Sequence, residues 1–328
     1  MQNAFDFYLP TRLCFGSGAR RRLPEQLTRL GVRNLLLCTD KMLRSAGVVE
    51  KITSILDGCA DVRYTIYDDV TENPGNSVVD GGAALARELG CDGVLGLGGG
   101  SALDTATGVA MLMTNGGKAL DYFHGKGVSQ ASLPTILLPT TSGTGSEVTM
   151  GAVISDHDER HKYAIMDPNL VPKYAVLDPK LTVSMPKFVT ATTGIDALTH
   201  AVESYVTWAY NNNASNRNAE EAVVKIFRNL KRAYEDGNDL EAREAMLIAS
   251  YKAGLAFNHT GVGYVHAIAH AMGGIYNTAH GLANAVIMPI VLEDYGTAVH
   301  PQLAHLAEIT GVKTTGSDAE KANAFIAA

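Results

Sequence analysis

The segment Gly93-Val-Leu-Gly-Leu-Gly98-Gly99-Gly100-Ser101-Ala-Leu-Asp104 passes from an apolar run through a glycine loop into a helical pattern. Glycines let the backbone approach a ligand closely, and a helix N-terminus offers free N–H groups and the positive end of its dipole. The segment therefore predicts a strand, a diphosphate-binding loop and a helix. Ser101 stands where the motif G-x-G-x-x-G has its third glycine, so the loop departs from that motif. A turn in which Ser101 caps the helix and Asp104 completes a capping box would explain the same residues.

Similar apolar runs recur on both sides of this segment and alternate with helical patterns. The strand-like runs are 34–39, 62–67, 93–97 and 135–138, and helical patterns between them include 77–89 and 103–114. This alternation is typical of a mostly parallel, Rossmann-like sheet with helices on both faces. After about residue 186 helical patterns such as 219–235 and 240–257 dominate. We expect an α/β domain over residues 1–183 and an all-α domain over residues 184–328.

The composition excludes several classes of protein. With 328 residues and 46% apolar content, the chain can bury a large core. No apolar run approaches the roughly 18 residues of a membrane helix, and the N-terminus lacks the features of a signal peptide. The formal charge of −7 offers no basic surface for nucleic acid, and the four cysteines form no C-x-x-C pair. We expect a cytoplasmic, globular enzyme with no nucleic-acid or membrane partner.

A second polar loop follows the run 135–138. It reads Pro139-Thr140-Thr141-Ser142-Gly143-Thr144-Gly145-Ser146-Glu147, and its hydroxyl groups could donate to phosphate or ribose oxygens. The alternative is a turn rich in serine and threonine that caps a helix. Both loops would lie at the carboxyl ends of parallel strands, where open α/β sheets bind ligands.

Asp40 ends the first strong strand-like run. A carboxylate at that place can accept a hydrogen bond from the ribose 2′-OH of an adenine dinucleotide and repel a 2′-phosphate, which predicts NAD(H) over NADP(H). A helix N-cap would explain the same aspartate.

The second half of the chain concentrates residues that bind metals: Asp196-x3-His200, His266-x3-His270 and His280. Residues four apart on a helix lie on one face about 5–6 Å apart, so each pair can aim two side chains at one point. Imidazole and carboxylate groups suit Fe, Zn, Co or Ni. The spacing therefore predicts a divalent metal site, and the absence of H-E-x-x-H argues against a zinc protease.

Taken together, the motifs resemble those of the iron-containing (group III) alcohol dehydrogenase family. The resemblance spans nearly the whole chain and rests on both polar loops, Asp178-Pro179, the run 193–203 and His266-x3-His270 followed by His280-Gly-x-x-Asn284-Ala285. It implies a dehydroquinate-synthase-like fold, in which NAD(P) and a divalent metal occupy the cleft between an α/β domain and a helical domain.

The resemblance also implies roles for residues. The expected metal ligands are Asp196, His200, His266 and His280, which leaves His270 as a residue that contacts the ligands or relays a proton. The expected cofactor contacts are Asp40, Asn73, Gly99, Gly100, Ser101, Asp104, Thr140, Thr141, Thr144, Lys162 and Leu181. Family members often carry lysine where this chain has Thr107, and they commonly continue for some tens of residues past Ala328, so we expect a shortened helical domain.

We expect a metal- and NAD-dependent alcohol dehydrogenase or aldehyde reductase for a small primary alcohol or diol. The metal, Fe²⁺ or alternatively Zn²⁺, would act as a Lewis acid on the alcohol oxygen, while hydride passes to C4 of the nicotinamide. His270, or a chain of water and ribose hydroxyl groups, would move the proton. The family suggests a homo-oligomer, a dimer or larger.

Two alternatives stay open. A lyase resembling dehydroquinate synthase would need several basic residues to hold a phosphorylated, carboxylated substrate. The Lys and Arg residues of the helical domain lie mainly within 225–243, on helices that we expect to be solvated, and the residues flanking the expected ligands are apolar. Those flanking residues are Ala197, Leu198, Ile268, Ala269 and Met272. The second alternative is a non-catalytic remnant that binds NAD and metal without turnover.

Overall fold

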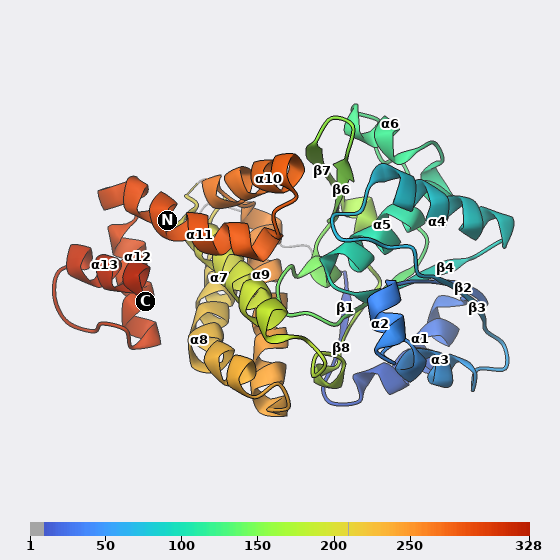
Figure 1. Ribbon diagram of the computed structural model, residues 1–328, viewed down its shortest axis with the longest axis horizontal. Coiled ribbons are helices and arrows are strands. Elements are labelled where there is room, and N and C mark those ends of the chain that lie inside the picture. The colour runs from blue at the N-terminus through green and yellow to red at the C-terminus, as the bar shows by residue number, and fades with distance from the viewer. Residues whose placement is uncertain (1–9, 209) are drawn as a thin grey trace. The chain divides into compact units, whose positions relative to one another are not determined.

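A parallel sheet of six strands organises the first half of the computed structural model, which describes residues 10–208 and 210–328 (Figure 1). The strand order is β1-β8-β5-β4-β2-β3, and every pairing within this sheet is parallel. The strands are β1 (Arg12–Phe15), β2 (Asn34–Cys38), β3 (Arg63–Tyr67), β4 (Gly93–Gly98), β5 (Thr135–Pro139) and β8 (Tyr174–Leu177). The predicted parallel α/β sheet is confirmed.

Four of these strands, β2 to β5, coincide with the apolar runs in the sequence, whereas β1, β8 and a hairpin were not predicted. Strand β1 is mostly exposed and has no apolar run, whereas β8 is a buried run of four apolar residues, as long as the predicted run 135–138, and was missed. The hairpin joins β6 (Gly151–Asp156) to β7 (His161–Met166) as a separate antiparallel sheet. Its strands carry Asp, His and Lys, residue types that are depleted in most strands or neutral there.

Helices cover both faces of the sheet, because successive side chains of a strand point to opposite faces. Leu36 and Val94 contribute to one buried cluster, and Leu35, Leu37 and Leu95 contribute to another. The helices of this half are α1 (Leu23–Leu30), α2 (Lys41–Ser45), α3 (Glu50–Leu56), α4 (Asn76–Glu88), α5 (Gly100–Asn115) and α6 (Ala119–Phe123), with short 3-10 turns η1 (Ala19–Arg22), η2 (Ser146–Val148), η3 (Pro168–Leu170) and η4 (Pro179–Leu181). Burial on both faces explains why the inner strands β2, β4, β5 and β8 are almost entirely apolar.

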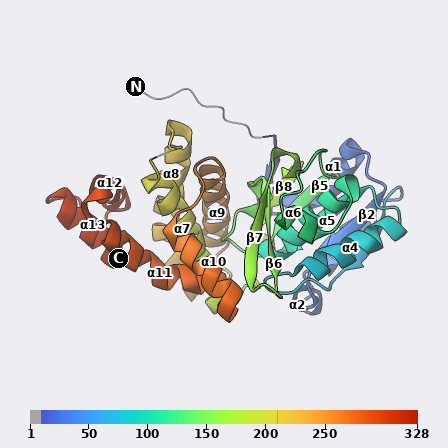
Figure 2. The same cartoon turned by 90° about the horizontal axis from the view of Figure 1, so that it is seen from above.

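The second half is helical, as predicted. Its elements are α7 (Lys187–Val206), α8 (Asn213–Glu235), α9 (Leu240–Thr260), α10 (Tyr264–Tyr276), α11 (His280–Tyr295), η5 (Gly296–Ala298), α12 (His300–Thr310) and α13 (Asp318–Ala327). Helices α7, α8 and α9 pack against one another (Figure 2). Their contact surface is rich in buried alanines, including Ala201, Ala222 and Ala253, and small side chains let helices approach closely.

Arg243 corrects one expectation about this helical half. We expected the basic residues within 225–243 to be solvated, but Arg243 is only 1% exposed. Its guanidinium donates to the Thr190 hydroxyl at 2.9 Å and to the carbonyl oxygens of Gly237 and Met185 at 3.0 and 3.3 Å. Arg243 therefore ties the start of α7 to the turn between α8 and α9.

The chain divides into two compact units. A sheet unit comprises residues 10–141 and Ser146–Ser184, and a helical unit comprises Ser142–Gly145 and Met185–Ala328. The short segment Ser142–Gly145 belongs to the helical unit because its glycines pack tightly there. A side chain on Gly145, which has a φ of +63°, would meet Gly254 Cα at 2.9 Å.

The described helices were also compared with the dimensions of a lipid bilayer. Among residues 10–208 and 210–328, no single helix is long and apolar enough to cross a membrane. Two consecutive helical segments, His280–Ala298 and His300–Thr310, are together long and apolar enough, but the chain bends by 119° between them.

Candidate metal centre

One face of α7 presents three acidic or imidazole side chains. Asp196, His200 and Glu203 follow one another at spacings of four and three residues, which places them along one side of the helix. All three are buried, with exposures of 2%, 5% and 1%. Such residues are almost never buried without a partner, so this face indicates a site.

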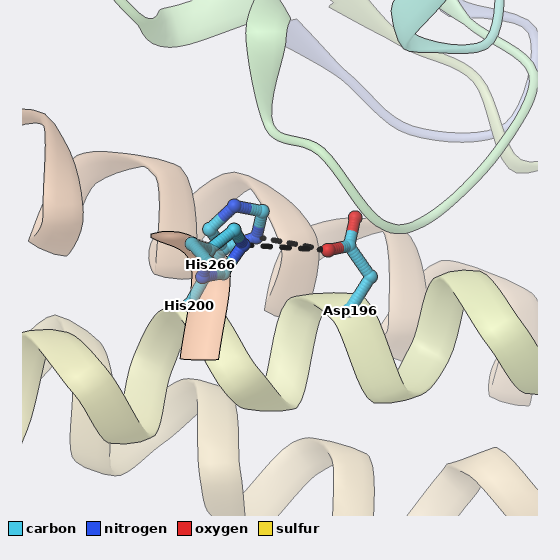
Figure 3. A group of neighbouring side chains, drawn as sticks. All are labelled: Asp196, His200 and His266. Carbon is cyan, nitrogen blue, oxygen red and sulfur yellow. Dashed lines mark ion pairs between the residues drawn. The ribbon is translucent and has the colours of Figure 1, made fainter. Parts of the chain in front are cut away.

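Two further histidines approach this face from the helices that follow in sequence. His266 lies in the first turns of α10, and His280 is the first residue of α11. One ligand atom each from Asp196, His200 and His266 can be chosen so that all lie within 4.8 Å of one another (Figure 3). Two imidazole nitrogens lie near one oxygen, Asp196 Oδ1: His280 Nε2 at 3.4 Å and His266 Nε2 at 3.6 Å. The structure thus brings together the four residues expected as ligands.

Ring stacking holds the imidazoles in place. The His200 ring lies 4.3 Å from Phe257 at an interplanar angle of 17°, and 4.3 Å from His266 at 25°. Phe257 comes from α9, so three helices of the unit contribute to one stack. Packing of this kind fixes rotamers before any ligand arrives.

The electrostatics of the site favour cation binding. Burial alone would raise the pKa of Asp196, but the surrounding imidazoles of His200, His280 and His266 outweigh it and hold that pKa well below its usual range. Burial lowers the pKa of His200 to about 3, against the opposing effect of Asp196. For Asp196 and His200, a charged carboxylate beside a neutral imidazole is the protonation state that binds a metal. Burial opposes protonation of His266, but its hydrogen bonds to Asp196 and Glu203 raise its pKa to about 9, so a metal ion bound there must displace a proton.

An unsatisfied nitrogen supports the same conclusion. Nδ1 of His200 is buried without a hydrogen-bond partner and lies 3.8 Å from Asp196 Oδ1. Leaving such an atom unpaired costs about 1–3 kcal/mol, which a bound cation would offset. Three imidazoles and one carboxylate form a donor set suited to Fe²⁺ or Zn²⁺. The residues present therefore fit a divalent metal ion.

Two residues of the site were given no role from the sequence. Glu203 Oε2 lies 2.5 Å from His266 Nδ1, and Oε1 accepts a hydrogen bond from Val265 N–H at 2.7 Å. Asn284 Nδ2 donates to Asp196 Oδ1 at 2.8 Å and lies 3.2 and 3.3 Å from Nε2 of His266 and His280. Each stands one helical turn after a ligand candidate, at i+3 from His200 and at i+4 from His280, and this spacing was the available signal.

His270 lies beside the group without joining the compact set. Its ring centroid is 5.1 Å from that of His280 and 6.0 Å from that of His266, and the residue is partly buried. It follows His266 by one turn of α10. This position allows His270 to act next to the metal ligands.

The glycine loop of the sheet unit has the expected strand–loop–helix form, but the capping alternative is wrong. Helix α5 has Gly99 as its N-cap, with no side-chain cap bond, so Gly100 and Ser101 lie inside the helix. Asp104 is buried, and its Oδ2 accepts a hydrogen bond from Val153 N–H of β6 at 3.0 Å. Gly98 has a φ of +154°, and a side chain there would meet Ala102 Cβ at 2.6 Å. The loop therefore needs glycine at this position.

The second polar loop begins beside the first. Thr140 N–H donates to the carbonyl oxygen of Gly98 at 2.9 Å, and a side chain on Gly99 would lie 3.4 Å from Thr141 Cγ2. Thr144 belongs to the segment that packs with the helical unit. Thr140 and Thr141 thus adjoin the glycine loop within the sheet unit.

The remaining cofactor candidates lie in different surroundings. Asp40 caps α2, since its Oδ1 accepts from Leu43 N–H at 2.8 Å, which confirms the N-cap alternative. Its Oδ2 also lies 3.8 Å from where a side chain on Gly98 would begin. Lys162 Nζ donates to Asn73 Oδ1 at 2.7 Å, whereas Leu181 is fully buried in the core of the sheet unit.

Two protein-family models match consecutive parts of the chain. The model of iron-containing alcohol dehydrogenases matches residues 10–179, and the model of the C-terminal part of Fe-containing alcohol dehydrogenases matches residues 190–328. Together they cover most of the sheet unit and the helical unit.

Individual proteins agree with these models. The chain is 36% identical over 312 residues to an NAD-dependent methanol dehydrogenase of Bacillus methanolicus, covering 95% of this chain and 81% of the relative. It is 38% identical over 329 aligned residues to a 1,3-propanediol dehydrogenase of Klebsiella pneumoniae, covering 98% and 84%. The crystal structure of a 1,3-propanediol oxidoreductase superimposes with a TM-score of 0.94 at 37% identity, covering 99% of this chain and 85% of that one.

Proposed function

The chain belongs to the iron-containing alcohol dehydrogenase family, and we propose that it interconverts a small primary alcohol or diol and the corresponding aldehyde with NAD. Membership makes it an oxidoreductase of alcohols from a family that uses a metal. The observation that carries the proposal is the convergence, in the helical unit, of one carboxylate and two imidazoles that are buried with a third imidazole, His280, that is partly exposed.

We assign the metal to Asp196, His200, His266 and His280. When bound there, a divalent ion supplies Lewis-acid stabilisation of negative charge on the substrate oxygen. Asp196 contributes the one negative charge of the set, and the three imidazoles contribute neutral nitrogens. Fe²⁺ is the ion favoured here and Zn²⁺ the alternative. Elemental analysis after anaerobic purification, followed by activity after adding each ion to chelated protein, distinguishes them.

We assign His270 as the proton-relay group. Its ring centroid lies 5.1 Å from that of His280, and it belongs to the same helix as His266, which places it close enough to serve the site. A positioned acid–base group typically contributes about 10²–10⁴-fold to turnover. His270→Ala should therefore lower kcat by that order while metal content stays at the wild-type value. Loss of metal from this variant would make His270 a ligand instead.

We assign the dinucleotide to the glycine loop and its neighbours in the sheet unit. Residues Gly99, Gly100 and Ser101 form the N-terminus of α5, whose dipole favours a diphosphate. Thr140 and Thr141 adjoin this loop and supply hydroxyl donors. The carboxylate of Asp40, which faces Gly98, would repel a 2′-phosphate, so we propose NAD(H) over NADP(H).

A small neutral substrate fits the residues around the metal ligands. Ala197 and Ala269 are fully buried beside them. The guanidinium of the buried Arg243 already donates to the hydroxyl and carbonyl groups of Thr190, Gly237 and Met185. Substrate selectivity per methylene is typically about 1–3 kcal/mol, so a panel of alcohols should give a graded response.

The test is the net formation of NADH after mixing metal-loaded protein with primary alcohols and diols. The same protein treated with a chelator is the control, because it should lose turnover. A lyase resembling dehydroquinate synthase would return its NAD unreduced, and a non-catalytic remnant would bind both NAD and metal without turnover. A homo-oligomer is also part of the proposal, and analytical ultracentrifugation tests it.

A further inference from the structure

We propose that Glu203 is a positioning residue that orients the His266 ring and holds its proton on Nδ1, so that Nε2 faces Asp196 and the metal. This inference rests on the proposed metal site. The two nitrogens of the His266 ring face two different carboxylates. Nδ1 lies 2.5 Å from Glu203 Oε2, and Nε2 lies 3.6 Å from Asp196 Oδ1. A ring whose Nδ1–H donates to a carboxylate presents the lone pair of Nε2, and this is the tautomer that binds a metal.

The second carboxylate oxygen of Glu203 also has a hydrogen-bond partner. Oε1 accepts from the backbone N–H of Val265 at 2.7 Å, in the first turn of α10. A carboxylate at a helix N-terminus is stabilised by the helix dipole and by the otherwise unpaired N–H groups. Glu203 thus connects α7, which carries Asp196 and His200, to the start of the helix that carries His266.

Gly263 provides independent support. It is the N-cap of α10, and a side chain there would meet Glu203 Oε1 at 2.8 Å and Cδ at 3.3 Å. The φ of Gly263 is −115°, so its backbone conformation does not require glycine. The contact explains the small residue here, because only glycine leaves room for the carboxylate.

The geometry predicts what neutralising Glu203 does. In the wild-type protein, Val265 N–H and His266 Nδ1–H each donate to one carboxylate oxygen of Glu203. In Glu203→Gln only one oxygen remains, and an amide NH₂ facing Nδ1 would favour the other tautomer, with the proton on Nε2. Outer-shell partners of metal-binding histidines typically contribute about 10–100-fold to metal affinity, so we expect a loss of that order.

The experiment measures metal affinity of chelator-treated full-length protein by competition with a chromophoric chelator, using Zn²⁺ and Co²⁺ as probes. Glu203→Gln should weaken both, and should change the visible absorption of bound Co²⁺, which reports ligand geometry. Glu220→Gln is the matched control, since Glu220 Oε1 accepts from the Tyr205 hydroxyl at 3.0 Å and lies 3.2 Å from His305 Nε2, and neither residue is a ligand candidate. Wild-type affinity and an unchanged Co²⁺ spectrum in Glu203→Gln would overturn the proposal.

Two further variants keep the test decisive if Glu203→Gln folds poorly. Gly263→Ala should displace the carboxylate without removing its charge and should weaken Co²⁺ binding in the same direction. In a double-mutant cycle with His266→Gln, the effect of Glu203→Gln on affinity should largely disappear. An undiminished effect would show that Glu203 does not act through His266. Failure of the wild-type protein to bind either ion would instead contradict the proposed metal site, so the two failures are distinguishable.

Discussion

Buried carboxylates behave in opposite ways in the two units of this chain. In the sheet unit, burial raises the pKa of Asp104 and of Glu147 to about 7, because desolvation outweighs the interactions that stabilise their charged forms. In the helical unit, Asp196 is equally buried, yet the imidazoles around it hold its pKa below the usual range. Burial alone therefore does not identify a metal ligand. Burial together with facing imidazoles does.

The two units also use different chemical groups for binding: side chains in the helical unit and backbone in the sheet unit. The metal centre uses side chains, each with a partner: Glu203 for His266, Asn284 for Asp196 and Phe257 for His200. The glycine loop uses backbone and the absence of side chains, as the tight approach of Ala102 to Gly98 shows. Removing a side chain should therefore damage the metal centre, whereas adding a side chain should damage the glycine loop.

The largest effect is expected from Asp196→Asn. It removes the only negative charge of the ligand set. Metal affinity should therefore fall further than the roughly 10–100-fold that is typical when a residue hydrogen-bonded to a metal ligand is lost. NADH binding, measured by fluorescence, should stay at the wild-type value. Asp294→Asn, on the exposed side of α11, is the control. A variant that retains metal at full affinity would remove Asp196 from the ligand set.

Gly98→Ala tests the other half of the comparison. The added Cβ would lie 2.6 Å from Ala102 Cβ at a φ of +154°, so the loop must shift. Such strain costs about 1–3 kcal/mol, and we expect NADH affinity to fall by about tenfold or more while metal affinity is unchanged. Gly90→Ala is a matched control with φ +64° and open space around it. Equal NADH affinities in both variants would argue against the loop as the diphosphate site.

Glu147→Gln tests why the buried carboxylates differ. The folded-state pKa of Glu147, about 7, lies above its ordinary value of 4.5, so ionisation destabilises the fold. That destabilisation is absent below pH 4.5, grows up to pH 7 and is complete above it. The free energy of unfolding of the variant, relative to wild type, should therefore rise with pH across this window by up to about 3 kcal/mol. Urea titrations from pH 5 to 8 measure it.

The control for this series is Glu88→Gln, which changes an exposed carboxylate at the end of α4. Its free energy of unfolding should follow that of the wild type at every pH. A difference between Glu147→Gln and wild type that does not vary with pH would mean that Glu147 is not ionised through burial in this way.

The smallest effect is expected from Asp40→Ser. Serine also caps helices, so the cap of α2 should survive while the charge beside Gly98 is lost. The ratio of NADP to NAD affinity should rise by about tenfold, which corresponds to about 1.4 kcal/mol. Isothermal titration with both nucleotides gives this ratio, and the melting temperature tests the cap. An unchanged ratio would leave Asp40 as a cap only.

Much of the architecture could be predicted because local pattern and tertiary burial agree. Strands β2, β4 and β5 are almost entirely buried, so their apolar runs stand out in the sequence. Long helices such as α8 carry a clear polar face. Strand β1 is mostly exposed and has no apolar run, and the short apolar strand β8 was missed. Strands β6 and β7 form a small separate sheet whose polar residues hid them.

The sequence by itself determined the chemistry available to this protein, because residue type and helical spacing specify which side chains share a face. Asp196 with His200, and His266 with His270, could be paired from spacing alone. Only the tertiary structure decided which of them converge. The contacts of Glu203 with His266 and of Asn284 with Asp196 join residues 63 and 88 positions apart, a separation across which local spacing carries no information. The fold, through packing between helices, decides those contacts.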